Sequence, residues 1–188
     1  KVTMKKVLIM TPDIEGPVRN GGIGTAFTAL ATTLAKKGYD VDVLYTCGDY
    51  SESSVSKFSD WSRIYSTFGI NLLSTGLVKE INIDAPYFRR KSYSILLWLK
   101  ENNIYDTVIS CEWQADLYYT LLSKKNGTDF ENTKFIVNTH SSTLWADEGN
   151  YQLPYDQNHL ELYYMEKMVV EMADEVVSPS QYLIDWML

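Results

Sequence analysis

Two adjacent glycines at the start of an amphipathic stretch are the first residues of this chain that could do chemistry. Gly21 and Gly22 follow Arg19 and Asn20, and a stripe of apolar residues at helical spacing begins at Ile23. Glycines at a helix N-terminus allow backbone N–H groups to approach an anion closely. The stretch therefore indicates a phosphate-binding loop. The alternative is a tight turn in which the glycines are needed for a positive φ.

Two common phosphate-binding motifs do not fit this stretch. The segment Gly22-Ile23-Gly24 lacks the third glycine of the dinucleotide-binding motif, because Phe27 stands at that position, and the Gly-Lys-Ser/Thr of a P-loop is absent. A nicotinamide-dependent oxidoreductase stays an alternative, because Asp49 follows the second expected strand and could meet a ribose hydroxyl.

Two further groups of candidate site residues follow short apolar runs that read as strands. Glu112 and Trp113 follow the run 107–110, and His140 follows the run 134–139. Glu112 could bind a hydroxyl group or act as a carboxylate at a helix start, and Trp113 could stack on a sugar or pack in the core. His140 is placed to hydrogen-bond a ligand, unless it is tied to a backbone carbonyl.

The residues around the glycine pair predict a strand, a helix and a second strand in succession. The run 4–10 is apolar and rich in strand formers, and the run 41–46 reads as the next strand. Between them apolar residues recur at helical spacing from Ile23 to Leu34, and Gly38 is a stop signal. This order is typical of a βαβ unit with parallel strands.

The rest of the chain continues this alternation. We expect a surface loop at 51–59, a strand or hairpin within 70–83, helices over 88–103, 115–124 and 159–173, strands over 107–110, 134–139 and 175–178, and a last helix capped by Ser180. Four apolar residues lie roughly in line along the helix 159–173: Leu160, Tyr164, Met168 and Met172. Together the elements predict one Rossmann-like α/β domain over residues 1–188, with a doubly wound, mainly parallel sheet and helices on both faces.

In such a sheet, ligands bind at the carboxyl ends of the strands, where the strand order reverses. The glycine pair, the Glu112-Trp113 segment and His140 each follow an expected strand. We therefore expect these three stretches to share one crevice.

The composition is that of a globular protein and argues against several classes of function. Of 188 residues, 45% are hydrophobic and 22% are charged, and the net charge of −7 argues against a general nucleic-acid surface. No apolar run approaches the roughly 20 residues that span a bilayer. Cys47 and Cys111 lie far apart, which suggests a reducing compartment, the cytoplasm, and no metal site.

One run of positive charge stands out in this acidic chain. Arg89-Arg90-Lys91 could meet an anionic acceptor or a lipid head group, which would give the protein a membrane-peripheral position. The alternative is a solvated face, as is usual for a charge run.

Four segments, in order along nearly the whole chain, resemble the N-terminal domain of retaining GT-B glycosyltransferases of the glycogen synthase and bacterial family-4 type. They are RNGGIGTA, ISCEWQAD, IVNTHSS and EMADEVVSPSQYL. The first is similar to a Lys-Thr-Gly-Gly-Leu-like loop, with Arg19 and Asn20 in place of Lys and Thr. The second resembles a His-Asp-Trp segment, with Cys111 and Glu112 in the first two places. The third matches a strand that ends in a site histidine, here His140, and the fourth resembles the segment that closes the domain.

The resemblance implies transfer of a sugar, with retention, from a nucleotide-sugar donor to a saccharide or lipid-linked acceptor. It implies that Arg19, Asn20, Gly21 and Gly22 approach the donor diphosphate and that His140 contacts the donor sugar. In this family the N-terminal domain mainly receives the acceptor, a role to which Glu112 and Trp113 could contribute. No metal or other cofactor is implied, because helix N-termini and basic side chains stabilise the leaving diphosphate.

The family also has a C-terminal domain that holds most of the donor. This sequence ends inside its last expected helix with the apolar residues Met187 and Leu188, so we expect a fragment that lacks that domain and transfers no sugar alone. A sugar-binding or partner-binding module without catalysis stays a further alternative, because a fold does not fix a function.

Overall fold

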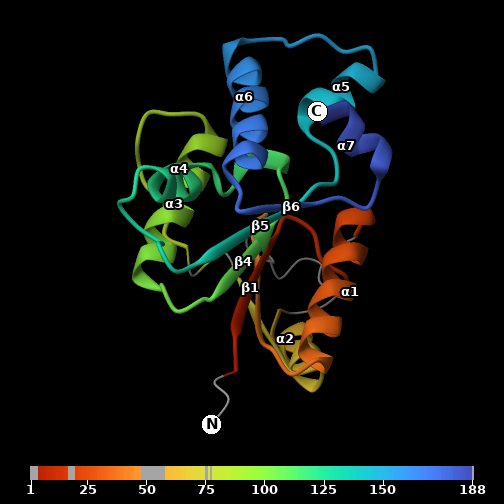
Figure 1. Cartoon of the computed structure of the whole chain (residues 1–188), viewed down its shortest axis with the longest axis vertical. Coiled ribbons are helices and arrows are strands. Elements are labelled where there is room, and N and C mark those ends of the chain that lie inside the picture. Colours follow the sequence, from red (N-terminus) through yellow and green to blue (C-terminus); the bar gives the residue numbers. More distant parts are fainter. Residues whose placement is uncertain (1–3, 17–19, 48–57, 75, 77, 188) are drawn as a thin grey trace. The chain divides into compact units, whose positions relative to one another are not determined.

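The computed structural model describes residues 4–16, 20–47, 58–74, 76 and 78–187, and it is an α/β structure. Six parallel strands form one sheet in the order β3-β2-β1-β4-β5-β6 (Figure 1). The strands are β1 (Lys6–Thr11), β2 (Asp40–Tyr45), β3 (Ile70–Leu73), β4 (Thr107–Ser110), β5 (Lys134–Asn138) and β6 (Glu175–Val177). This arrangement confirms the predicted Rossmann-like fold.

Helices connect and flank the strands. They are α1 (Gly22–Lys36), α2 (Phe58–Thr67), α3 (Tyr87–Glu101), α4 (Tyr118–Lys125), α5 (Thr143–Gly149), α6 (Gln157–Met172) and α7 (Gln181–Met187), with a single 3₁₀ turn, η2 (Trp113–Ala115), before α4. No helix in the described ranges is both long enough and apolar enough to cross a bilayer.

The chain folds as two compact units. The first comprises Lys1–Lys79 and Ile104–Ile109, and the second comprises Glu80–Asn103 and Ser110–Leu188. The first unit therefore holds the glycine loop, and the second holds Glu112, Trp113 and His140.

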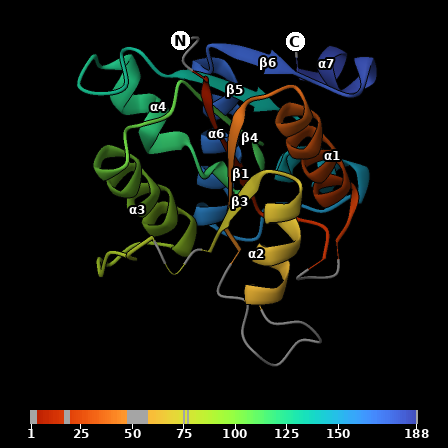
Figure 2. The same cartoon turned by 90° about the horizontal axis from the view of Figure 1, so that it is seen from below.

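In the first unit, β1 lies between β2 and β4, and its central residues Leu8, Ile9 and Met10 are fully buried. Two helices of the first unit, α1 and α2, are labelled in Figure 2. The helix α1 buries Phe27 and Ala31 and ends before Gly38, whose φ of 86° is the left-handed conformation expected of a helix stop. The helix α2 was not predicted. It contacts the loop after β1 through Tyr65, whose hydroxyl donates to the carbonyl of Glu15 at 2.7 Å.

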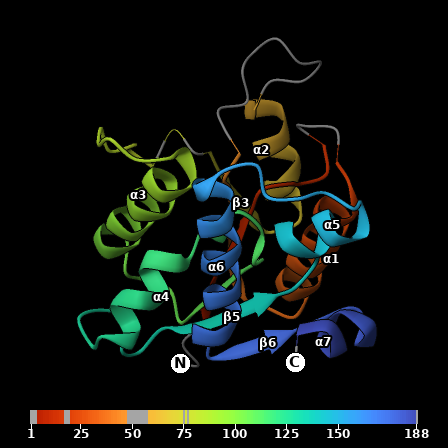
Figure 3. The same cartoon turned by 90° about the horizontal axis from the view of Figure 1, so that it is seen from above.

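In the second unit, α3 and α4 lie side by side (Figures 1 and 3). The helix α6 does not present the apolar line of the sequence analysis to the core, because Leu160 and Tyr164 are more than half exposed. Its buried face instead carries His159, Leu162, Met165, Glu166 and Val169. Two polar residues are thus part of the inner face.

The last helix, α7, begins as the sequence predicts. The hydroxyl of Ser180 accepts a hydrogen bond from the backbone N–H of Leu183 at 3.4 Å, which is the geometry of a helix N-cap. The helix α5 was not predicted; Ser142 caps it by accepting from the N–H of Trp145 at 3.2 Å.

Candidate functional site

The glycine loop already binds a carboxylate of its own chain. One oxygen of Asp13, Oδ2, accepts hydrogen bonds from the backbone N–H groups of Gly21 at 2.7 Å and Gly24 at 2.9 Å. This places a negative charge at the N-terminus of α1, where the unpaired N–H groups and the helix dipole favour it. Two N–H donors of this loop are thus used by an internal acid, and the contact of the loop with a phosphate stays a prediction.

The glycine pair does not adopt an unusual backbone conformation, and close packing requires only the following glycine, Gly24. Neither Gly21 nor Gly22 has a positive φ, so the alternative of a tight turn with left-handed glycines is wrong. A Cβ atom at Gly24 would lie 2.8 Å from the carboxyl group of Asp13 and from the Cβ of Asn20. A Cβ atom at Gly22 would meet nothing within 4 Å. The glycine that the packing requires is thus Gly24, and Gly22 faces open space.

Arg19 and Asn20 precede the glycine pair in the sequence. Arg19 lies outside the described residues, as does Asp49, on which the oxidoreductase alternative depends. The exposed side chain of Asn20 donates to the hydroxyl of Thr25 at 3.0 Å and to the carbonyl of Gly21 at 3.3 Å. The side chain of Asn20 thus braces the first turn of α1.

In the second unit, the structure brings Glu112 and His140 together. Both carboxylate oxygens of Glu112 lie 3.0 Å from the backbone nitrogen of His140, whose N–H donates to them. Glu112 is 1% exposed, and this burial raises the pKa of its carboxyl group to about 7. Glu112 therefore holds the chain at the carboxyl end of β5. Its predicted contact with an acceptor hydroxyl stays a prediction.

His140 is half-buried, and burial lowers the pKa of its imidazole below the usual 6.5. A neutral imidazole can both donate and accept a hydrogen bond, which suits recognition of a hydroxyl group.

A second buried acid, Glu166 of α6, secures the same region. Its Oε1 accepts from the N–H of Gln114 at 2.9 Å and from the hydroxyl of Thr143 at 2.7 Å. Its Oε2 accepts from the N–H of Thr143 at 2.6 Å. Burial, with a smaller contribution from the charge of Glu112, raises the pKa of Glu166 to about 7. Shifted pKa values cluster at functional sites, and this makes the region around the two glutamates a candidate site.

The backbone beside Glu166 is strained. Gln114 and Ala115 have φ values of 66° and 53°, a left-handed conformation that residues with a side chain rarely adopt. The hydrogen bond from Gln114 to Glu166 helps to hold this conformation. Such strain occurs often at binding and catalytic sites.

A pocket of about 350 Å³ opens beside the two glutamates, and its lining belongs to the second unit alone. It is lined by Glu112, Ser142, Leu144, Tyr163, Tyr164, Glu166, Lys167, Val170, Glu171, Trp186 and Met187. Ligand pockets in proteins commonly have this size and combine an apolar lining with a few polar groups. This pocket is the candidate binding site of the second unit.

Some hydroxyl and aromatic residues near His140 serve the fold. Ser142 caps α5 and Thr143 bonds to Glu166, so the structure gives both a local role. Trp113 is half-buried in the 3₁₀ turn, and its stacking on a sugar stays a prediction. His159, the other histidine of the chain, is buried, and its Nε2 lies 3.0 Å from Oδ2 of Asp147.

The three residues of the basic run Arg89-Arg90-Lys91 lie in different environments on α3. Lys91 is buried, and its ammonium group lies 2.8 Å from the carboxylate of Asp116. Arg89 and Arg90 lie nearer the surface, beside glutamates of α6 and of the segment before α3. The interpretation of the whole run as a solvated face, or as a single anion-binding patch, is therefore wrong for Lys91.

Sequence reasoning missed Asp13 and Glu166. A signal for Asp13 was present, since an acid at a strand end precedes a helix whose third residue is glycine. For Glu166 the sequence carried no comparable signal, because an acid in a helix is usually exposed. Of the three stretches expected to share a crevice, the structure brings Glu112 and His140 into hydrogen-bonding contact, and a ligand crevice at this place stays a prediction. Its extension to the glycine loop stays a prediction.

Comparisons with known proteins leave the function open. No model of a known protein family matches the chain, and no curated protein matches it by sequence. The chain is similar to a Vibrio parahaemolyticus protein of unknown function, with 11% identity, 96% of each chain covered and a TM-score of 0.44. It is also similar to an NADH-dependent reductase complexed with NAD, with 10% identity, 93% of this chain and 95% of that chain covered, and a TM-score of 0.35. Neither similarity assigns a function to this chain.

Proposed function

We propose that this chain is the N-terminal, acceptor-side domain of a retaining GT-B glycosyltransferase, which transfers a sugar from a nucleotide-sugar donor to a saccharide or lipid-type acceptor. The observation that carries the proposal is the pair formed by Glu112 and His140. A buried carboxylate fixes the backbone of a half-buried histidine at the carboxyl end of β5. The four segments that resemble the family supply the reaction class.

In this proposal His140 contacts a hydroxyl group of the donor sugar. The lowered pKa of its ring keeps the imidazole neutral at pH 7, so one ring nitrogen can donate and the other can accept. Glu112 acts through His140 as a positioning residue, because both of its oxygens face the backbone N–H of His140. A fixed hydrogen-bonding group costs no reorganisation when the sugar–phosphate bond breaks.

The glycine loop would meet the leaving diphosphate. Gly22 presents open space in which a phosphate can approach the backbone. The carboxylate of Asp13 opposes this role where it occupies the N–H groups of Gly21 and Gly24, since like charges repel. Binding of a diphosphate therefore requires the Asp13 side chain to move or the contact to be limited to the remaining donors.

The test uses the product of the complete reading frame. It is incubated with UDP-, GDP- and ADP-linked sugars, and released nucleoside diphosphate and glycosylated product are measured. We expect release with one class of donor, and His140→Ala should lower kcat/KM at least tenfold, about 1.4 kcal/mol, with little change in Tm. Binding of NAD without turnover of any sugar nucleotide would instead favour the oxidoreductase. Binding of free sugars without turnover would favour a non-catalytic module.

A further inference from the structure

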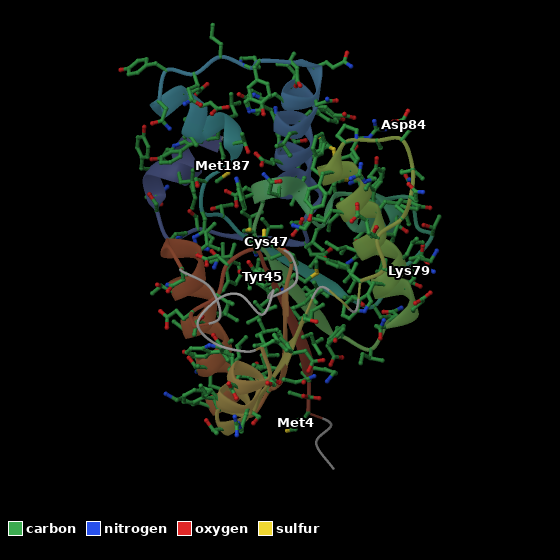
Figure 4. All side chains as sticks on the ribbon, turned by 180° about the vertical axis from the view of Figure 1, so that it is seen from behind. Met4, Tyr45, Cys47, Lys79, Asp84 and Met187 are labelled. Carbon is green, nitrogen blue, oxygen red and sulfur yellow. The ribbon has the colours of Figure 1, made fainter. Side chains whose placement is uncertain are left out.

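The pocket beside Glu112 and Glu166 has a lining of two chemical kinds. Leu144 of α5, Val170 of α6 and Trp186 of α7 provide apolar surface, and Met187 lies at the end of α7 (Figure 4). Apolar side chains on three helices favour an apolar group of comparable size.

Hydrogen-bonding groups stand beside this apolar surface. The hydroxyl of Ser142 accepts from the N–H of Trp145, which leaves its own proton available to donate. The carboxyl group of Glu166 accepts three hydrogen bonds from the protein and is 0% exposed, so it supports the pocket wall and is not open to a ligand. The hydroxyl of Ser142 can therefore donate to a hydroxyl group of a ligand.

The charges at the pocket disfavour an anion. Three glutamates line it, at positions 112, 166 and 171, and the one lysine of the lining, Lys167, lies 3.7 Å from Glu171. The lysine is thus already beside an acid. A phosphate or carboxylate group would enter next to two buried acids without a cation reserved for it, which is costly.

We propose that this pocket binds the acceptor as an uncharged glycoside, with an aromatic or alkyl aglycone against Leu144, Val170 and Trp186 and with a sugar hydroxyl toward Ser142. The role of this glycoside as the acceptor rests on the proposed function, whereas its binding as an uncharged glycoside rests on the pocket alone. Tyr163 and Tyr164 add aromatic surface of the kind that packs against sugar rings.

Phenyl β-glucoside, phenyl β-galactoside and phenyl α-mannoside are suitable probes, titrated by calorimetry into the full-length protein. Free monosaccharides and phenyl phosphate serve as comparison ligands. We expect at least one phenyl glycoside to bind ten or more times more tightly than its free sugar and than phenyl phosphate, because each comparison ligand lacks one required feature. Equal affinities, or tightest binding of phenyl phosphate, would overturn the proposal.

Two variants locate the binding. Val170→Trp fills the pocket with a large side chain and removes no hydrogen bond, so it should reduce the affinity at least tenfold. Leu160→Trp adds similar bulk on the same helix at a position that is 55% exposed, and it should bind like wild type. If Val170→Trp does not fold, Leu144→Trp replaces it from α5. Unchanged binding by a folded filled variant places the ligand elsewhere and overturns the proposal.

Donor turnover, measured in the same preparations, separates this inference from the proposed function. Turnover of a sugar nucleotide without binding of any phenyl glycoside overturns the inference and leaves the glycosyltransferase intact. Glycoside binding that Val170→Trp abolishes, without turnover of any donor, confirms the pocket and contradicts the proposed function.

Discussion

Glu112 holds the backbone N–H of His140 between its two carboxylate oxygens, each at 3.0 Å, although the residues lie 28 positions apart in the chain. The sequence predicts a ligand contact for each residue, and both contacts stay predictions. The structure adds that Glu112 positions the backbone of His140. A buried acid is costly unless it is hydrogen-bonded, and here the strand end supplies the donors.

The two buried glutamates should make stability depend on pH in an unusual direction. Their pKa values of about 7 lie above the ordinary 4.5. Between these values the folded state keeps protons that the unfolded chain releases, so the free energy of unfolding falls as pH rises through this window. Glu166→Gln removes one of the titrating groups.

We expect the fall in Tm between about pH 5 and about pH 8 to be smaller in Glu166→Gln than in wild type. Thermal unfolding of both proteins across this range measures the difference. Groups such as His140, whose lowered pKa acts in the opposite direction, are common to both proteins and cancel. Parallel curves for the two proteins would show that Glu166 titrates as it does in the unfolded chain.

Gly22 and Gly24 should respond oppositely to the same substitution. Gly24→Ala places a methyl group 2.8 Å from Asp13 and Asn20, so either the carboxylate or the helix start must shift. We expect Tm to fall. Gly22→Ala meets open space within α1, where alanine is favoured over glycine by up to about 1 kcal/mol. Its Tm should stay equal or rise, and a fall of similar size in both variants would contradict this account.

Asp13→Ala should separate the two roles of the glycine loop. Loss of the carboxylate leaves the N–H groups of Gly21 and Gly24 without their acceptor and should cost about 1 kcal/mol, as at other helix N-caps. If a nucleoside diphosphate binds to this loop, its affinity should rise, because the competing internal charge is gone. The exposed acid Glu15 gives the control, since Glu15→Ala removes the same charge nearby. Weaker diphosphate binding in Asp13→Ala alone would mean that Asp13 shapes the site.

Neighbouring positions of the basic run should differ sharply in their contribution to stability. Lys91→Met leaves the buried carboxylate of Asp116 without its cation, which typically costs about 3–5 kcal/mol. Arg89→Met removes a partly exposed pair whose atoms lie 3.6 Å apart and should cost less than about 1 kcal/mol. Chemical denaturation measures both. The double variant Lys91→Met/Asp116→Leu should recover part of the loss, and no recovery would mean that Lys91 acts through other contacts.

The strands could be predicted because each is a short apolar run between turn residues, as in 107–110 and 134–138. The helix α2 carries Phe58, Trp61, Ile64 and Tyr65 at helical spacing, so its signal was present and was overlooked beside the polar stretch 51–59. The helix α5 is seven residues long, too short to show an apolar period, and its N-cap defines its start instead.

The inner face of α6 was misjudged for a related reason. Apolar periodicity follows Leu160 and Tyr164, but the buried face includes His159 and Glu166, whose partners come from distant segments. Partners such as Asp147 and Thr143 cannot be read from the helix itself. For the same reason the sequence identified Glu112 and His140 as candidates but did not reveal the hydrogen bonds between them.

The two glutamates also determine how slowly parts of the backbone open. The amide hydrogens of Gln114, His140 and Thr143 lie outside the strands, where exchange with solvent deuterium is normally fast. Each of them is donated to a carboxyl group that is almost fully buried. Exchange at these three positions therefore requires the hydrogen bond to a buried glutamate to break, and these three amides outside the sheet should be protected like those of the sheet. Hydrogen exchange would then register the region around the pocket as one cooperative element rather than as flexible connections.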